Sequence, residues 1–128
     1  MNIALILHDN TMTSKNALNR PLHADKNDAD LYLLKTIAFT HKKTPIKELN
    51  RFFLHEENRR ERLEYLKFSC DIDEIFYVAT CNRIEFFFTT HHVLDTNFLR
   101  KFYRHFRTDW NTEEVDFALK YGEIYEGE

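Results

Sequence analysis

The sequence predicts a single α+β domain of the ferredoxin-like type, a βαββαβ sandwich in which two helices cover one face of an antiparallel sheet. The chain has 128 residues, 43% of them hydrophobic and 15% aromatic, which suits one hydrophobic core. Short β-prone runs alternate with two helical patterns, and two of the β-prone runs are separated by only two residues. This order and spacing favour the sandwich.

The first 30 residues differ from the rest of the chain. After the apolar run at residues 3–7, the stretch 10–30 is rich in Asn, Asp, Lys and Thr and contains Pro21. It shows no sustained hydrophobic period. We therefore expect a loosely ordered N-terminal extension over residues 1–30 and a folded domain over residues 31–128.

The first strand and the first helix are expected on either side of Pro45. Residues 35–40 are β-prone, and the proline ends regular pairing shortly after them. Residues 56–68 begin with acidic side chains, carry Lys67 near their end and allow i,i+4 pairs of opposite charge. This pattern is typical of a helix.

A tight hairpin is expected next. Residues 73–80 and 83–90 are strongly β-prone and are joined only by Cys81 and Asn82. Asn82 tolerates the left-handed backbone conformation that such a turn often needs. The two runs therefore predict adjacent antiparallel strands.

The second helix and the last strand complete the pattern. The helix is expected at residues 96–106, with Thr96 as N-cap. It has one apolar stripe, formed by Phe98, Leu99, Phe102 and Phe106. Residues 115–121 alternate between apolar and polar side chains up to Gly122, which predicts a half-buried strand.

Composition excludes several kinds of site. Both glycines, Gly122 and Gly127, lie in the last seven residues, so the first 121 residues contain none. The GxGxxG and GxxxxGK[ST] loops need glycine where the backbone approaches phosphates, and we expect no cofactor-binding residues for a nucleotide in this chain. The net charge of −3 does not support a general coat for nucleic acid.

The two cysteines, Cys70 and Cys81, are interpreted as free thiols. The opening residues lack a basic region before their short apolar run, and no apolar stretch approaches the length of a membrane span. We therefore expect a cytoplasmic protein with no membrane partner. Cys70 follows the first helix and is expected to be a packing residue.

The segment 79–85 is the strongest candidate for chemistry. A cysteine in a tight turn between two strands is held on a rigid scaffold and is partly exposed. In an extended chain Arg83 projects on the same side as Cys81, where its guanidinium would favour the thiolate and could bind a carboxylate. The alternative is that Cys81 is a small turn residue and Arg83 a surface charge.

The block Thr80-Cys-Asn-Arg83 followed by Glu85, together with the upstream block Ile37-Ala-Phe-Thr-His-Lys-Lys-Thr-Pro45, resembles the N-terminal catalytic domain of glutamyl-tRNA reductase. The resemblance runs from about Leu34 to the C-terminus. It implies NADPH-dependent reduction of glutamyl-tRNA to glutamate-1-semialdehyde, with release of tRNA, in tetrapyrrole biosynthesis. In that scheme Cys81 attacks the aminoacyl ester, and hydride from NADPH reduces the resulting thioester.

The resemblance also implies roles for the neighbouring residues. Arg83 would bind the glutamate carboxylate and Thr80 would help to bind the substrate, while Asn82 and Glu85 would shape and brace the turn. His41 lies in the upstream block and either lines the substrate pocket or makes a local hydrogen bond in its own turn.

The chain departs from the family pattern in three respects. The NADPH-binding and dimerisation domains of the family enzyme are absent, so the resemblance implies a fragment that needs the rest of the reductase chain within a homodimer. The family's general-base histidine lies beyond the last residue of this chain. The arginine that usually follows the proline of the upstream block is missing, with Lys47 or Arg51 as possible replacements.

Two weaker signals, a pair of histidines and a row of arginines, also have ordinary structural explanations. His91 and His92 are adjacent, adjacent strand residues face opposite ways, and no second Cys or His pair stands at ligand spacing, so we predict no metal site. A basic stripe on the second predicted helix either contacts tRNA phosphates or is a solvated face. It consists of Arg100, Arg104 and Arg107.

An alternative function is a noncatalytic RRM-like RNA-binding module. The order βαββαβ is also that of the RRM, whose aromatic strand residues stack on bases. Against this alternative, the third predicted strand lacks the glycine-containing RRM pattern and the net charge is negative.

Overall fold

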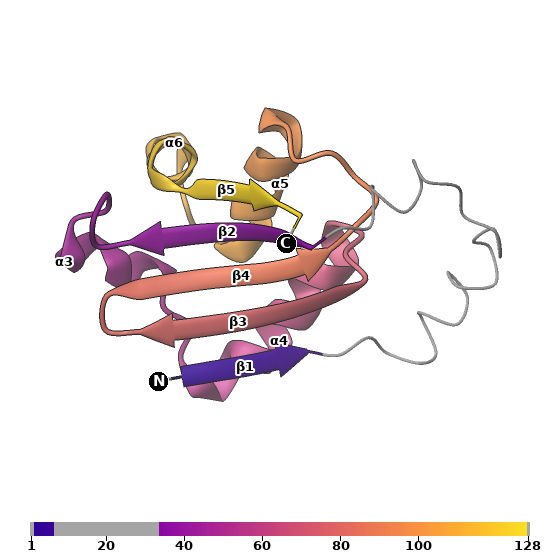
Figure 1. Ribbon diagram of the computed structural model, residues 1–128, viewed down its shortest axis with the longest axis horizontal. Coiled ribbons are helices and arrows are strands. Elements are labelled where there is room, and N and C mark those ends of the chain that lie inside the picture. The colour runs from indigo at the N-terminus through magenta and orange to yellow at the C-terminus, as the bar shows by residue number, and fades with distance from the viewer. Residues whose placement is uncertain (1, 7–33, 128) are drawn as a thin grey trace, which may run out of the picture.

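A computed structural model describes residues 2–6 and 34–127. Figure 1 shows the sheet in front of its helices. The elements in chain order are β1 (Asn2–Ile6), β2 (Lys35–Thr40), α3 (Ile46–Leu49), the 3₁₀ turn η1 (Asn50–Phe52), α4 (Glu56–Ser69), β3 (Glu74–Thr80), β4 (Arg83–Thr89), α5 (Thr96–Phe106), α6 (Thr112–Tyr121) and β5 (Glu123–Glu126).

The sheet confirms the ferredoxin-like prediction. Its five strands lie in the order β1-β3-β4-β2-β5, and every neighbouring pair is antiparallel. The four strands β5-β2-β4-β3 form the sheet of the sandwich, and α4 and α5 lie behind it, as Figure 1 shows. None of the described helices lies on the opposite face of the sheet in Figure 1.

The core lies between the sheet and the helices. Alternate residues of β3 and β4 are buried, as expected for strands with one covered face. Phe86 of β4 meets Phe102 and Phe106 of α5, with ring centroids 5.3 Å apart in both pairs. The amphipathic stripe predicted for residues 96–106 is therefore the face that packs on the sheet. Its helix is capped by Asp95 and not by Thr96, because the Asp95 side chain accepts from the Phe98 N–H at 2.9 Å.

The predicted strand at residues 115–121 is wrong. These residues belong to α6, and the last strand of the sandwich is β5, which pairs with β2. The Asn111 side chain accepts from the Glu114 N–H, and the Glu114 side chain accepts from the Asn111 N–H, which together form a capping box. Val115 and Ala118 are the buried residues of the helix, three positions apart.

The N-terminal strand adds an edge to the sandwich. Residues 2–6, the start of the expected extension, form β1 and pair with β3. Residues 7–30 of that extension lie outside the described residues. Among the helices that the structure describes, none has the length and apolar character needed to cross a membrane.

Candidate functional site

The β3–β4 turn presents Cys81 at the surface. Thr80 pairs with Arg83 as the last residues of the ladder, and the exposed Cys81 follows Thr80 directly in the two-residue connection. The Thr80 hydroxyl lies 3.4 Å from Asn82 Oδ1 and 3.4 Å from the Arg83 carbonyl oxygen. These contacts tie the turn to the strand that precedes it.

The left-handed conformation expected for Asn82 is not present. Asp71 is the one non-glycine residue with positive φ in the described part of the chain. The turn therefore differs from the type I′ and II′ hairpin turns, which require positive φ at one or both central residues. Asn82 instead contributes through its side-chain oxygen and through its backbone carbonyl.

The upstream block meets the turn through a backbone hydrogen bond. The His41 N–H donates to the Asn82 carbonyl oxygen at 3.0 Å, and β2 pairs with β4 as far as Thr40 opposite Arg83. The structure thus places the exposed His41 beside the turn that holds Cys81, although the two lie 40 residues apart in the sequence.

Arg83 makes a bidentate pair with Glu85. Its Nε lies 2.9 Å from Glu85 Oε1 and its Nη2 lies 3.2 Å from Oε2. The hydrogen bond to Glu85 is the main cause that raises the pKa of the Arg83 guanidinium. Glu85 therefore braces the arginine, and the pair occupies two of the three guanidinium nitrogens.

A cleft of about 290 Å³ opens beside the turn. One wall comes from α3, η1 and the residue after them, a segment in which the sequence predicted no helix. The other wall comes from the hairpin. The lining residues are Leu49, Asn50, Phe53, Ala79, Thr80, Cys81 and Ile84.

The first wall of the cleft is fixed by side chains from elsewhere in the chain. Tyr77 accepts from the Leu54 N–H at 2.8 Å and donates to the Phe52 carbonyl oxygen at 3.0 Å. The buried Arg59 donates to the Leu54 carbonyl oxygen at 2.7 and 3.1 Å, and Arg107 donates to the Phe53 carbonyl oxygen at 2.6 Å. Buried backbone groups need such partners, so these contacts hold residues 52–54 in place.

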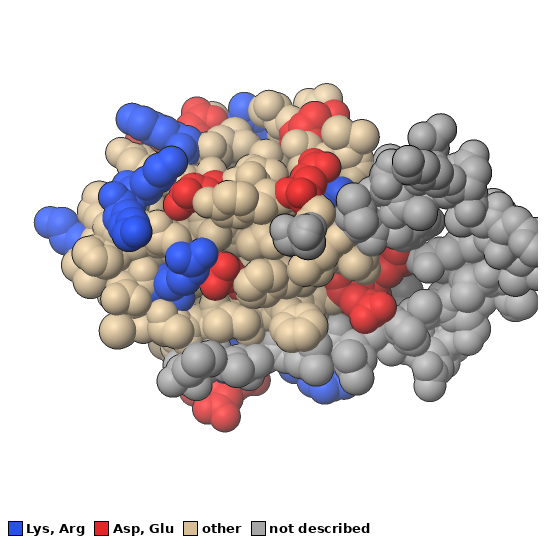
Figure 2. All heavy atoms as spheres, in the orientation of Figure 1, with Lys and Arg blue, Asp and Glu red and all other residues tan. Residues whose placement is uncertain are grey.

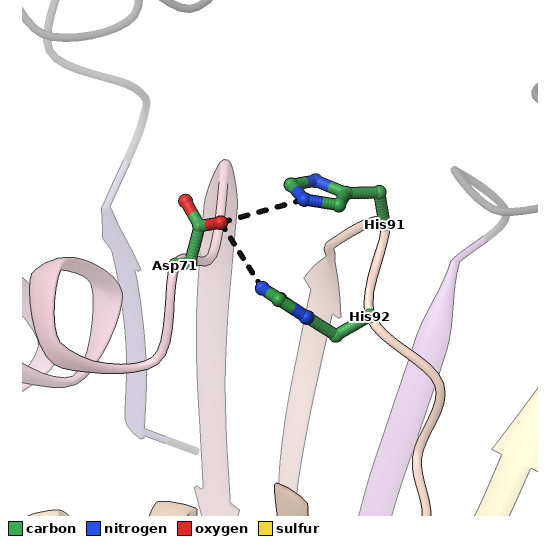
Figure 3. A group of neighbouring side chains, drawn as sticks. All are labelled: Asp71, His91 and His92. Atoms are coloured by element: carbon green, nitrogen blue, oxygen red, sulfur yellow. Dashed lines mark hydrogen bonds and ion pairs between the residues drawn. The ribbon is translucent and has the colours of Figure 1, made fainter.

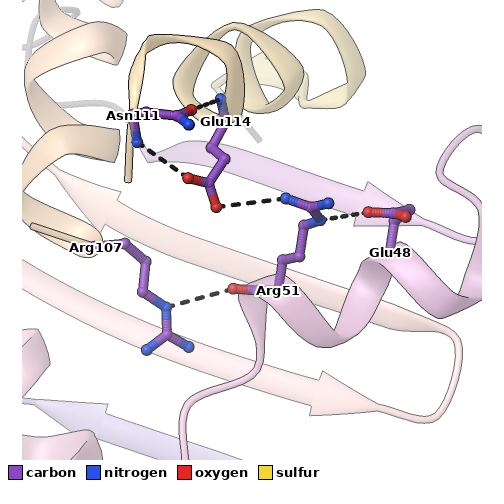
Figure 4. Close-up of polar contacts among 5 residues, drawn as sticks. All are labelled: Glu48, Arg51, Arg107, Asn111 and Glu114. Carbon is purple, nitrogen blue, oxygen red and sulfur yellow. Dashed lines mark hydrogen bonds and ion pairs between the residues drawn. The ribbon is translucent and has the colours of Figure 1, made fainter. Parts of the chain in front are cut away.

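Arg51, one of the two possible replacements for the arginine of the family pattern, makes contacts that support the fold. Figure 4 shows Arg51 between Glu48, to which its Nε is hydrogen bonded, and Glu114, whose Oε2 lies 3.5 Å from Nη1. Its guanidinium also lies 5.4 Å from the ring centre of Phe117. These contacts join η1 to α6. Lys47 is exposed.

The arginines of the predicted basic stripe partly bind other residues of the same chain. Arg100 Nη1 lies 3.2 Å from Asp116 Oδ1, and Arg107 bonds to the carbonyl oxygens of Arg51 and Phe53. Arg104 is exposed. Two of the three arginines therefore link α5 to neighbouring segments.

Basic side chains gather instead at the end of the sheet that holds the turn. Figure 2 shows a cluster of Lys and Arg at the left, where β2 ends and the hairpin turns, with acidic side chains beside it. Exposed basic residues of this region are Lys42, Lys43, Lys47 and Arg83. Such a cluster favours the approach of an anionic ligand to the turn.

The fold and the site define a ferredoxin-like α+β domain with an exposed cysteine at the rim of a cleft, beside basic side chains. The family model for the N-terminal domain of glutamyl-tRNA(Glu) reductase matches residues 37–128. The chain therefore belongs to this family, whose enzyme is an oxidoreductase of tetrapyrrole biosynthesis. A comparison with curated proteins finds no match.

Proposed function

We propose that this domain forms the thioester in the reduction of glutamyl-tRNA to glutamate-1-semialdehyde, with Cys81 as nucleophile. The observation that carries the proposal is the position of Cys81, exposed at the hairpin turn and lining a cleft of about 290 Å³. A rigid turn presents the thiol without burying it. This arrangement suits attack on a carbonyl group brought by a large substrate.

The step balances without a co-reactant. Cys81 Sγ attacks the carbonyl carbon of the glutamyl ester, a new C–S bond forms, and the bond from that carbon to the tRNA ribose oxygen breaks. The thiol proton ends on the ribose oxygen. The products are a glutamyl thioester on Cys81 and tRNA with a free hydroxyl group.

The residues around Cys81 supply binding and support. Arg83 would bind the glutamate side-chain carboxylate through the guanidinium edge that Glu85 leaves open, or by displacing Glu85. Thr80 and His41 flank the same turn and would contact the substrate, while Asn82 holds the turn to His41 through its carbonyl. The basic side chains at this end would attract tRNA phosphates.

The described residues contain no phosphate-binding loop that would hold the hydride donor, NADPH. NADPH needs a phosphate-binding backbone, and the first 121 residues contain no glycine for either common loop. We propose that NADPH is bound by another domain, within a homodimeric cytoplasmic enzyme formed with the rest of the reductase chain. The free thiols of Cys70 and Cys81 agree with a reducing compartment.

The test is intact-protein mass spectrometry after mixing the protein with glutamyl-tRNA. We expect an adduct with the mass of one glutamyl group that hydroxylamine removes, present in the wild type and in the Cys70→Ala control. The Cys81→Ala variant should form none. An adduct that survives Cys81→Ala would overturn the assignment. If the wild type forms no adduct, a full-length reductase whose own catalytic cysteine is replaced is added to it. A mixture with neither an adduct nor reductase activity would also overturn the assignment.

An RRM-like RNA-binding module stays the alternative because the open sheet face carries aromatic side chains. Phe76 is 42% exposed and Tyr125 is 51% exposed, and aromatic residues on such a face can stack on bases. The same face carries Glu85 and Glu123, which repel phosphates. Fluorescence anisotropy decides between the two functions: an RRM-like module binds uncharged single-stranded RNA, with equal affinity in wild type and Cys81→Ala, and loses that binding in Phe76→Ala.

A further inference from the structure

A second group of reactive side chains lies at the other end of the sheet from Cys81. Asp71 follows α4, and His91 and His92 follow β4 (Figure 3). Asp71 Oδ2 lies 3.0 Å from His92 Nε2 and 3.5 Å from His91 Nε2, so both imidazole rings converge on one carboxylate oxygen. All three side chains are exposed.

The backbone beyond β4 allows both histidines to face Asp71. The sequence-based prediction of no metal site assumed a strand, in which adjacent side chains alternate. β4 ends at Thr89, and His91 and His92 lie in a bend where that alternation does not apply. Their rings stack with centroids 4.5 Å apart, and Figure 3 shows both rings turned toward Asp71.

The two loops are joined beneath the side chains. Thr90 is fully buried, and its hydroxyl donates to the Asp71 carbonyl oxygen at 2.8 Å and accepts from the His92 N–H at 3.2 Å. Asp71 has a φ of 55°, a conformation that aspartate tolerates better than most residues. The backbone therefore holds the carboxylate against the two rings before any ligand binds.

The distances from Asp71 Oδ2 to the two imidazole nitrogens fit a bound metal ion. Bonds of about 2.0–2.2 Å from a metal to nitrogen and oxygen ligands place neighbouring ligand atoms about 2.8–3.6 Å apart in octahedral or tetrahedral geometry. The two distances to Asp71 Oδ2 are 3.0 and 3.5 Å, and all three ligand atoms lie within 4.8 Å of one another.

We propose that Asp71, His91 and His92 form a binding site for one divalent transition-metal ion, with Zn²⁺ as the best-fitting ion and water in the remaining positions. Two imidazoles and one carboxylate are ligands that Zn²⁺ accepts readily. Mg²⁺ and Ca²⁺ prefer sites made of oxygen ligands, so the site discriminates against them. An ion there joins the segment after α4 to the segment after β4.

The adjacent Cys70 is not a ligand. Its side chain is 2% exposed, and burial raises the pKa of its thiol to about 11. Cys81, by contrast, is exposed and would bind Zn²⁺ on its own account. A test of the proposed site therefore needs a background in which Cys81 is replaced by serine.

The experiment is calorimetric titration of the Cys81→Ser protein with ZnCl₂, with MgCl₂ titrated in parallel. We expect one saturable Zn²⁺ site and no Mg²⁺ binding. Adding His91→Ala and His92→Ala should weaken Zn²⁺ binding by at least about tenfold, since loss of even an outer-sphere partner commonly has that effect. The matched control replaces His55 and His105 with alanine and should bind like the parent.

A second readout separates loss of the site from loss of the fold. Without metal, the circular-dichroism melting curves of the parent, the double-histidine variant and the control should each show one cooperative transition, at similar temperatures. With excess Zn²⁺, the melting temperature should rise in the parent and the control but not in the double-histidine variant. Zn²⁺ binding of unchanged affinity in the double-histidine variant, or no saturable binding in the parent, would overturn the proposal.

Discussion

The two cysteines show how strongly position determines the chemistry of a residue. Cys70 ends α4 and packs in the core, where burial raises the pKa of its thiol to about 11. Cys81 lies in the hairpin turn and is exposed. The sequence predicted both placements, because a cysteine at a helix end beside apolar residues tends to pack, whereas one in a two-residue connection has little to pack against.

This contrast predicts selective alkylation. In the folded protein at pH 8, iodoacetamide should modify Cys81 and leave Cys70 unmodified, because a buried thiol with a raised pKa supplies little accessible thiolate. Peptide mapping by mass spectrometry measures the two sites separately. In 6 M guanidinium chloride both should react at similar rates, and modification of Cys70 at a similar rate in the folded protein would contradict the structure.

The buried Tyr77 predicts a loss of stability at alkaline pH. Burial raises the pKa of its hydroxyl from 10.0 to about 12. Because the folded-state pKa lies above the unfolded one, the stabilising contribution is complete below pH 10 and is lost as the pH rises toward 12. The shift of two units corresponds to about 3 kcal/mol.

Tyr77→Phe tests this contribution, since it removes the hydroxyl that bonds to Phe52 and Leu54. At pH 8 the variant should be less stable than the wild type by about 1–3 kcal/mol in urea unfolding. At pH 11 the difference between the two proteins should shrink. Other titrating groups are common to both and cancel, so a difference that stays constant from pH 8 to pH 11 would refute the assignment.

At the scale of elements, α6 shows where strand periodicity misleads. Val115, Phe117, Leu119 and Tyr121 alternate with polar residues, yet the buried positions are Val115 and Ala118. In the strand pattern Ala118 stands on the side of Asp116 and Lys120, whereas in the helix it is buried together with Val115. The signal for a helix was present in Asn111 followed three residues later by Glu114, which forms the capping box.

The sequence predicted one wall of the candidate site but not the other. Both β-prone runs and the two-residue connection were clear in the sequence, so the place of Cys81 followed from them. The wall formed by α3 and η1 was not predicted, because elements of four and three residues are too short to show a helical period. Their position depends on Tyr77 and Arg107, which are distant in the sequence, and on Arg59 at the start of α4.

Gly122, at the end of α6, predicts an unusual effect of a small substitution. Its φ of −70° is open to any residue, so Gly→Ala would ordinarily stabilise the protein by restricting the unfolded chain. A Cβ atom there would lie 2.8 Å from the Tyr103 hydroxyl oxygen, 3.0 Å from the Ala118 carbonyl oxygen and 3.2 Å from the Phe39 ring. The methyl group has no room.

We therefore expect Gly122→Ala to lower the free energy of unfolding by about 1–3 kcal/mol in chemical denaturation. The exposed Lys120→Ala on the same helix serves as control and should change stability by less than about 0.5 kcal/mol. A Gly122→Ala protein as stable as the wild type, or more stable, would show that the junction of α6 and β5 is looser than the structure indicates.

Across the whole molecule, the aromatic core and the cleft are one connected structure. Phe52 stacks on Phe39 of β2 at 3.7 Å between ring centroids and meets the Trp110 ring at 5.5 Å. Phe53 follows Phe52 directly and lines the cleft. The wall that faces Cys81 is therefore the outer side of a segment whose inner side is core, and packing far from the turn sets the shape of the cleft.

Arg107 offers the sharpest test of this connection. It lies just after α5, is half-buried, and donates through Nη2 to the Phe53 carbonyl oxygen at 2.6 Å, while desolvation lowers the pKa of its guanidinium. Arg107→Met keeps the length and the apolar stem of the side chain but removes these hydrogen bonds. Arg104→Met, at an exposed position in the last turn of α5, is the matched control.

We expect Arg107→Met to lose about 1–3 kcal/mol of stability, because the partly buried Phe53 carbonyl group is left without its donor. Hydrogen exchange in a peptide covering residues 50–55 should accelerate in this variant under native conditions, whereas exchange in β3 and β4 should follow the global stability. Glutamylation of Cys81 should slow, while its reaction with iodoacetamide, which needs no cleft, should not. If Arg104→Met and Arg107→Met behave alike in residues 50–55, the wall does not depend on this contact.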